Sequence, residues 1–113
     1  MKLPTTPVPE NGYYYHNKHS DEKGLNDCAY EVIGVGIHTE DDCRPENAQM
    51  VLYRPLYDSE IYKRGKYYWI RPLEMWMSNL TENGKTFKRF QKISNPKIIE
   101  ELEKIKNEMY GEN

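Results

Sequence analysis

The chain has 113 residues, of which 37% are hydrophobic and 30% charged, with 16 Lys and Arg against 18 Asp and Glu. This length fits one domain, and no apolar run reaches the roughly 18 residues of a membrane helix, so we expect a soluble protein. The composition also argues against a wholly basic nucleic-acid binder. Segment 54–92 nevertheless carries nine basic and four acidic residues, whereas 1–53 and 93–113 are both net acidic. Such a basic middle can attract an anion or an acidic partner surface.

Residues 1–12 contain three prolines and end in an Asn-Gly turn, which predicts an extended, disordered lead. The lead lacks the apolar core of a secretory signal, so we expect a cytoplasmic protein. In that reducing compartment Cys28 and Cys43 are expected to be free thiols. The lead is followed by a small β domain over 13–93 and a helical segment over 94–113.

Strand-like composition marks most of the β domain. Gly34 and Gly36 lie inside one strand and suggest a bulge or a close backbone approach. A strand is expected to resume at 73–77 after Pro72. Asn83-Gly84 is the strongest turn signal in the chain and predicts a β-hairpin. The expected strands cover 13–16, 30–38, 49–54, 66–71, 73–77 and 86–93.

A helix is predicted to begin at Asn95, a favourable N-cap, with Pro96 at its first position. Gly111 is a natural end for it. The apolar stripe of this helix consists of Ile98, Leu102, Ile105 and Met109. Packing on the β domain is the favoured role of the stripe, over a coiled-coil seam. The predicted fold is mainly β: about five short antiparallel strands curled into a small barrel, with one C-terminal α-helix.

Three motifs carry a family resemblance: Tyr53-Arg54-x-Leu56-Tyr57, Trp69-Ile70-Arg71-Pro72-Leu73-Glu74-Met75-Trp76 and Arg89-Phe90. Upstream, Tyr14-Tyr15-His16, Tyr30-Glu31-Val32-Ile33-Gly34-Val35 and His38-Thr39-Glu40 extend it. Through these residues the chain resembles small bacterial and phage proteins classified as domain of unknown function 1653. The resemblance covers about 14–93 and implies an SH3-like barrel with no established activity. The chain departs from the pattern in its longer segments 17–29 and 41–48, in Ile37, and in the added helix.

Arginine and aromatic residues interleave in the basic middle of the chain. Arg54, Arg71 and Arg89 each lie within two residues of an aromatic ring, a pattern that suits a nucleotide or an acidic peptide. We expect the three guanidinium groups to meet at one rim, although a structural Arg71–Glu74 ion pair is an open alternative. His16 and His38 are expected at strand ends, able to hydrogen-bond a ligand or the backbone. The candidate ligand-binding residues are His16, His38, Tyr53, Arg54, Tyr57, Trp69, Arg71, Glu74, Arg89 and Phe90.

Metal and cofactor sites are not expected. The three histidines and two cysteines lack zinc-ligand spacing, and Asp41-Asp42 has no third spaced acid for a cation. The sequence offers only one conceivable acid-base pair for catalysis, His38 with Glu74. A hydrolase is therefore the least favoured hypothesis.

The favoured function is a non-enzymatic binding module for an anionic ligand, either a nucleotide-like small molecule or a short single strand. The alternative is a protein interaction adaptor or homodimer module that uses the same face. No membrane partner is expected.

Overall fold

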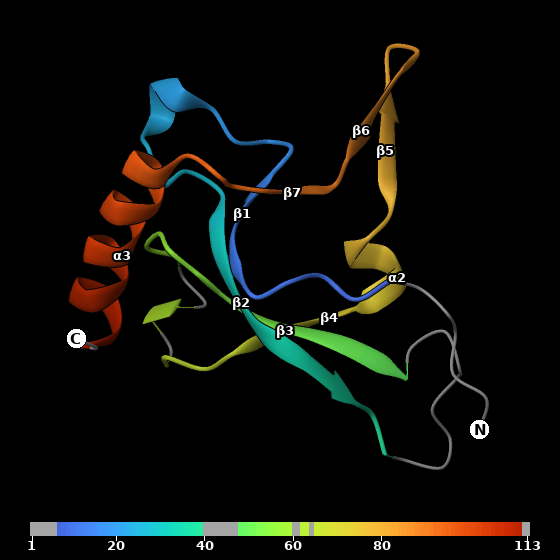
Figure 1. The fold of residues 1–113 in the computed structure, drawn as a ribbon, viewed down its shortest axis with the longest axis horizontal. Helices are drawn as coiled ribbons and strands as arrows, with labels where there is room; N and C mark the ends of the chain where they lie inside the picture. The colour runs from blue at the N-terminus through green and yellow to red at the C-terminus, as the bar shows by residue number, and fades with distance from the viewer. Residues whose placement is uncertain (1–6, 40–47, 60–61, 64, 112–113) are drawn as a thin grey trace.

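The computed structural model describes residues 7–39, 48–59, 62–63 and 65–111. Figure 1 shows a curled sheet with one long helix along one side and a two-stranded arm that projects away from it. The main sheet is antiparallel in the order β4-β3-β2-β1-β7, and the arm pairs β5 with β6. In chain order the elements are β1 (Gly12–His16), η1 (Asp21–Lys23), β2 (Ala29–Ile37), β3 (Gln49–Pro55), β4 (Trp69–Pro72), α2 (Leu73–Trp76), β5 (Asn79–Glu82), β6 (Lys85–Lys88), β7 (Phe90–Lys92) and α3 (Pro96–Tyr110).

The predicted mainly β fold with a C-terminal helix is confirmed, but the five-stranded sheet is open. Its two edges are β4 and β7, and within the described ranges these strands do not pair with each other. Between them the chain leaves the sheet to form α2 and the arm, and β7 itself has only three residues. These strands therefore do not form the closed barrel that the sequence predicts.

The two sides of the sheet face two different cores, because successive residues of a strand point to opposite sides. Tyr14 contributes to an aromatic cluster, and its neighbour Tyr13 contributes to a second cluster under α3. We call these sides the aromatic face and the helix face. The aromatic cluster comprises Tyr14, Tyr30, Val32, Val51, Tyr53, Leu73, Trp76 and Phe90. The helix-face cluster comprises Tyr13, Ala29, Leu56, Ile93 and Leu102.

The strand expected to resume at 73–77 is instead the short helix α2. Pro72 is extended, with φ −52° and ψ 135°, and the Met77 amide donates to the Leu73 carbonyl at 3.0 Å. This turn buries Leu73 and Trp76 together against the aromatic cluster. The prediction was wrong because the three-residue spacing of these two apolar side chains is helical rather than extended.

Glycine positions in the strands and the hairpin behave as predicted. The pairing of β2 with β3 shifts register between Val32 and Gly34, which is a bulge. At Gly36 a Cβ would lie 3.1 Å from Leu52 Cδ1, a close approach. Asn83 and Gly84 have φ of +52° and +77°, so the predicted hairpin turn joins β5 to β6.

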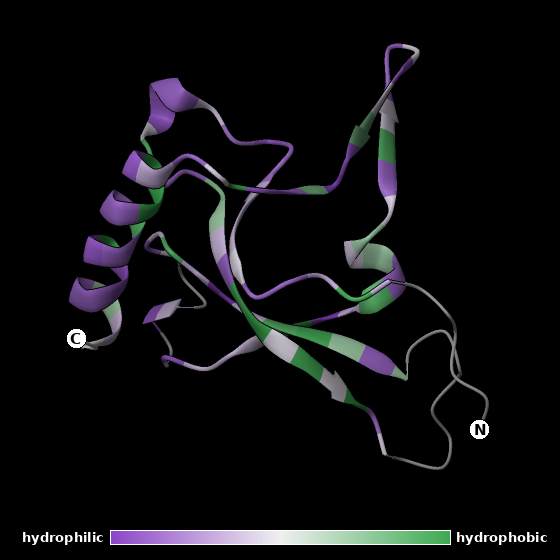
Figure 2. Ribbon diagram, in the orientation of Figure 1, coloured by the Kyte–Doolittle hydropathy of each residue, from purple (hydrophilic) through white to green (hydrophobic). Residues whose placement is uncertain are grey.

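Helix α3 covers the helix face of the sheet with its apolar side, while its polar side is turned outward (Figure 2). Leu102 is fully buried, and Ile98 and Ile105 pack beside it, which confirms the predicted packing of the stripe. Gly111 ends the helix in the left-handed conformation at φ 69°. Among the helices that the structure describes, none has the length and apolar composition needed to cross a membrane.

The side chain of Asn95 caps the N-terminus of α3. Asn95 Oδ1 accepts hydrogen bonds from the Lys97 amide at 2.9 Å and the Ile98 amide at 3.4 Å. Asn95→Ala is expected to lower the free energy of unfolding by about 1 kcal/mol, because two helix amides lose their acceptor. Urea denaturation measures the change, with the exposed neighbour Ser94→Ala as the control. Equal small losses in both variants would contradict the capping role.

Candidate functional site

Arg71 lies on the aromatic face, as its strand register requires. In β4, Trp69 and Arg71 stand opposite Tyr53 and Val51 of β3. Arg71 Nε donates to Tyr53 Oη at 3.4 Å, and the guanidinium carbon lies 5.3 Å from the centroid of the Phe90 ring. Arg71 Nη1 also lies 3.6 Å from the Met75 sulfur. Each of these contacts is with a neutral group, so the positive charge is not compensated by them.

Arg89 approaches the same part of the fold from the chain between β6 and β7. Its Nε donates to Ser78 Oγ at 3.0 Å, and its amide donates to the Ser78 carbonyl at 3.0 Å. Ser78 Oγ in turn donates to the carbonyl of Met75, the residue that Arg71 contacts. In the part of the chain that the structure describes, neither arginine pairs with a carboxylate. The Arg71–Glu74 ion pair, which the sequence left open as an alternative, is accordingly not present there, and Glu74 is exposed on α2.

His16 lies among three basic side chains, those of Arg71, Lys18 and Arg89, whose positive charges act on its ring. Its ring lies edge-on to Phe90 at 5.0 Å between centroids, and its Nδ1 accepts from the Lys18 amide at 3.1 Å. Burial lowers the pKa of His16 below its ordinary value, and the positive charges of Arg71, Lys18 and Arg89 lower it further. We call His16, Lys18, Arg71 and Arg89 the basic cluster.

Arg54 does not join the basic cluster, which corrects the predicted meeting of three arginines. It follows Tyr53 in β3 and therefore points to the helix face. There its Nε donates to Glu31 Oε1 at 2.9 Å, and its guanidinium carbon lies 4.2 Å from the centroid of the Tyr110 ring. Arg54 is buried, so its role in this fold is structural.

The predicted aromatic site residues are distributed between core and surface. Tyr53 and Phe90 are buried in the aromatic cluster. The Tyr57 hydroxyl lies 2.6 Å from that of Tyr30, and burial raises the pKa of both phenols, so this pair stays protonated. Trp69 is half-buried, with its ring 5.9 Å from that of Tyr53. Trp69 is therefore the predicted aromatic residue best placed to offer a ring beside Arg71.

The two histidines predicted as a pair lie at opposite ends of the sheet. His16 ends β1, and its amide donates to the Cys28 carbonyl just before β2 begins. His38 follows the last residue of β2 and is exposed, with its amide donating to the Ala48 carbonyl at 2.6 Å. Only His16 contributes to the basic cluster.

The described ranges contain no group of three or more His, Cys, Asp or Glu able to hold a metal ion. Cys28 is a free thiol, and burial raises its pKa. Cys43, Asp41 and Asp42 lie outside the described residues, so the predictions made for them stay predictions.

A pocket that sequence reasoning missed adjoins His16. It has a volume of about 550 Å³ and lies between the end of β1 and the arm. His19 lines it with its ring stacked on Tyr15 at 3.6 Å between centroids, and Phe87 and Lys88 of the arm line the other side. Phe87 is 43% exposed. A phenylalanine close to the predicted hairpin turn was the sequence signal that could have indicated this pocket.

The fold and this site together define a small, mainly β protein with a cationic patch beside an aromatic core. Residues 12–92 match the model of the family described as "Protein of unknown function (DUF1653)", and the chain belongs to this family. The match runs from β1 through β7 and stops before α3. No curated protein and no solved structure matches the chain significantly.

Proposed function

We propose that this protein is a non-enzymatic binding module whose basic cluster holds an anionic, ring-bearing ligand, namely a nucleotide either free or within a short single strand. The single observation that carries the proposal is the fixing of Arg71 and Arg89 by neutral partners around one site. Guanidinium groups held in this way keep N–H donors for an anion and need little reorganisation to bind it.

The surroundings of the cluster supply places for a planar ring. Trp69 is half-buried on the same face as Arg71, and Phe87 with the Tyr15–His19 stack lines the pocket beside His16. Bases stack on such rings with little dependence on sequence, while phosphates meet arginine. A phosphate at the cluster would therefore place its base within reach of an aromatic surface.

The fork geometry of Arg71 is tested by a conservative substitution. Arg71→Lys keeps the charge but loses the planar donors, so it is expected to weaken binding of adenosine monophosphate by roughly 1–3 kcal/mol. Isothermal titration calorimetry at fixed salt measures the loss, and adenosine without phosphate is expected to bind more weakly than the nucleotide. Lys97→Ala on α3 is the control and is expected to change little. Equal losses in both variants would indicate nonspecific electrostatics and contradict the proposal.

The protonation of His16 gives an independent readout. Its folded pKa lies below the ordinary 6.5, so the unfolded chain binds the proton first as pH falls. The lowered pKa of His16 therefore leaves the free energy of unfolding unaffected above about pH 6.5. As the pH falls from 6.5 through the folded pKa of His16, the free energy of unfolding decreases. A bound phosphate is expected to raise the pKa of His16, as followed by NMR of the ring protons, with His38 as the internal reference. Ligand binding without any shift at His16 would place the anion elsewhere.

The proposal extends to the type of fold and to the cellular setting of the protein. We infer that the curled sheet is an open variant of the SH3-like barrel expected for these bacterial and phage proteins, which the five-stranded antiparallel sheet supports. We also infer a cytoplasmic setting, which the free thiol of Cys28 supports.

A further inference from the structure

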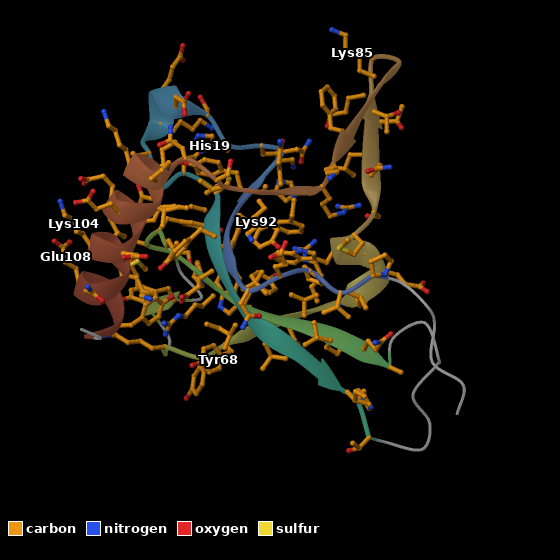
Figure 3. All side chains as sticks on the ribbon, in the orientation of Figure 1. His19, Tyr68, Lys85, Lys92, Lys104 and Glu108 are labelled. Carbon is orange, nitrogen blue, oxygen red and sulfur yellow. The ribbon has the colours of Figure 1, made fainter. Side chains whose placement is uncertain are left out.

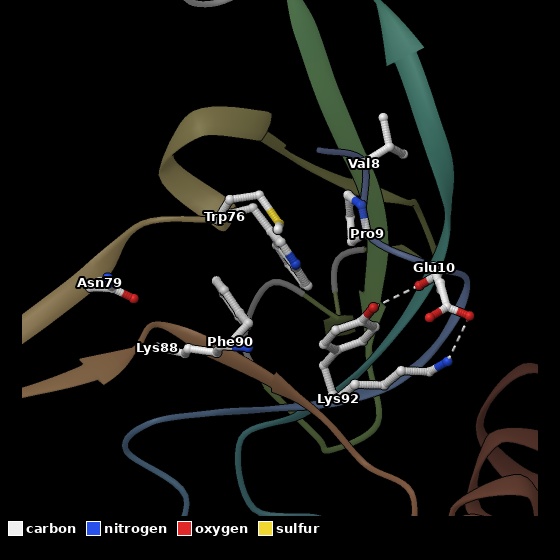
Figure 4. A pocket seen from close by; sticks show the side chains of 10 residues that line it. Val8, Pro9, Glu10, Trp76, Asn79, Lys88, Phe90 and Lys92 are labelled. Atoms are coloured by element: carbon white, nitrogen blue, oxygen red, sulfur yellow. Dashed lines mark hydrogen bonds and ion pairs between the residues drawn. The ribbon is translucent and has the colours of Figure 1, made fainter. Parts of the chain in front are cut away.

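A second pocket lies on the aromatic face, on the side of Trp76 that looks toward the N-terminal lead (Figure 4). Its volume is about 280 Å³. The rings of Trp76 and Phe90 form part of its wall and stack at 3.7 Å between centroids with an interplanar angle of 2°. Tyr14 stands edge-on to Trp76 at 5.7 Å. The pocket therefore offers flat aromatic surfaces and one phenol hydroxyl.

The opposite wall of this pocket is the chain's own segment 7–10, which we call the strap. Pro9 is buried, and Val8 and Glu10 lie on either side of it along the pocket (Figure 4). The ring of a proline fixes φ, and the residue before a proline favours an extended backbone, so the sequence Val8-Pro9 favours a polyproline-type conformation. The predicted lead is thus packed on the domain at 7–10, while residues 1–6 lie outside the described residues.

The contacts of the strap match the way aromatic grooves bind extended proline-containing peptides. Tyr14 Oη donates to the Glu10 carbonyl at 2.8 Å, and Glu10 Oε2 lies 3.3 Å from Lys92 Nζ. Grooves for such peptides pair aromatic walls for the proline rings with hydroxyl or charged groups for the polar backbone and flanking residues. Tyr14, Trp76 and Lys92 supply these three elements here.

The side chains on either side of the buried Pro9 are held weakly. The Glu10–Lys92 ion pair is exposed, with 82% and 42% of the two side chains accessible, and exposed ion pairs contribute little. Val8 is 56% exposed. Across the pocket, Met77, Asn79 and Lys88 line space that the strap does not fill. A peptide that makes the same contacts and also reaches this wall gains contacts that the strap does not make.

We propose that this pocket is a docking site for an extended peptide of a partner protein with the pattern apolar-Pro-acidic, and that the strap is its intramolecular competitor. The sequence Val8-Pro9-Glu10 defines the partner chemistry: proline against Trp76, a carbonyl accepting from Tyr14, and a carboxylate at Lys92 or Lys88. This surface serves a different ligand class from the basic cluster, so it stands without the nucleotide proposal.

The test measures binding of a synthetic peptide, Pro-Thr-Thr-Pro-Val-Pro-Glu-Asn, to the full chain by calorimetry and by NMR of the Trp76 indole. Two strap variants, Glu10→Ala alone and Pro9→Gly with Glu10→Ala, loosen the competitor and leave Tyr14, Trp76 and Lys92 on the other side of the pocket unchanged. The double variant is expected to bind the peptide at least tenfold more tightly than the unmodified chain, and Glu10→Ala alone, which loses only the exposed ion pair, about two- to fivefold more tightly. Glu82→Ala in the exposed arm is the matched control and is expected to leave the affinity unchanged.

Further controls change the prolines of the peptide and the tyrosine of the pocket. A peptide with Ala at all three proline positions is expected to bind at least tenfold more weakly, and Tyr14→Phe is expected to weaken binding in the Glu10→Ala background. Thermal melting tests whether each variant is folded. If the double variant does not fold, Glu10→Ala alone is used to test the competition. The proposal is overturned if the strap variants bind no more tightly, if the proline-free peptide binds equally well, or if the strap variants become dimers by exchange of their own leads.

Discussion

Phe90→Ala is expected to lower the free energy of unfolding by about 3–5 kcal/mol, because it removes a buried aromatic ring and leaves a cavity. Phe90 is 6% exposed and stacks on Trp76 at 3.7 Å. Its ring also meets Tyr30 edge-on at 5.8 Å and His16 at 5.0 Å. Because it touches groups from β1, β2 and α2, its loss affects the whole aromatic face.

The chain provides a matched control for this substitution. Phe87, three positions earlier, is 43% exposed in β6, and Phe87→Ala is expected to cost less than about 1 kcal/mol. Urea denaturation followed by circular dichroism measures both variants. Similar losses at the two positions would mean that Phe90 is not the centre of the aromatic cluster.

Arg54→Ala is expected to lower the free energy of unfolding by about 3 kcal/mol, because it leaves a carboxylate without its main partner under α3. The side chains of Arg54 and Glu31 are 7% and 14% exposed, and their atoms lie 2.9 Å apart. Lys106 Nζ also reaches Glu31 Oε2 at 3.3 Å, which offsets part of the loss. The ring of Tyr110 loses its cation at the same time.

Two further variants separate this role from general charge effects. Lys104 lies on the outer side of α3 (Figure 3), where its ion pairs are exposed, and Lys104→Ala is expected to cost less than about 1 kcal/mol. The double substitution Arg54→Met with Glu31→Met removes both charges together and is expected to regain part of the stability, because Lys106 then loses its carboxylate partner. If Arg54→Ala costs no more than Lys104→Ala, the buried pair is not structural.

Features set by neighbouring residues were predictable from the sequence. The cap at Asn95, the stop at Gly111 and the turn at Asn83-Gly84 each depend on contacts or backbone angles within a few residues. Their physical causes are therefore visible in a short window of sequence. The apolar stripe of α3 was also readable, because its spacing fixes which side of the helix is buried.

Arg54 shows why the site was less predictable. Its position next to Tyr53 in a strand already implies that the two side chains point to opposite faces, so alternation could have separated it from Arg71. Its partner Glu31 lies 23 residues away and is brought opposite Arg54 only by the register of β2 with β3. Local aromatic and basic patterns carry no information about such pairing.

The route of the chain after β4 was hidden for a related reason. The sequence indicates a hairpin at 83–84 but does not say whether its strands add to the main sheet or leave it. Tertiary packing decides this: Leu73 and Trp76 turn the chain into α2, and β5 and β6 then pair with each other as the arm. Only β7 returns to the sheet, beside β1.

The pairing of β1 with β7 also determines the order in which the protein can assemble. Tyr14 stands opposite Lys92, and His16 stands opposite Phe90, so these contacts close the longest loop in the sheet. Bringing distant segments together costs chain entropy before any contact is gained, and such contacts form slowly. The neighbouring strands β2 and β3 are expected to pair early, whereas the aromatic face is completed only when β7 arrives. Residues of β7 line both pockets, so neither pocket is complete before β7 has joined the sheet.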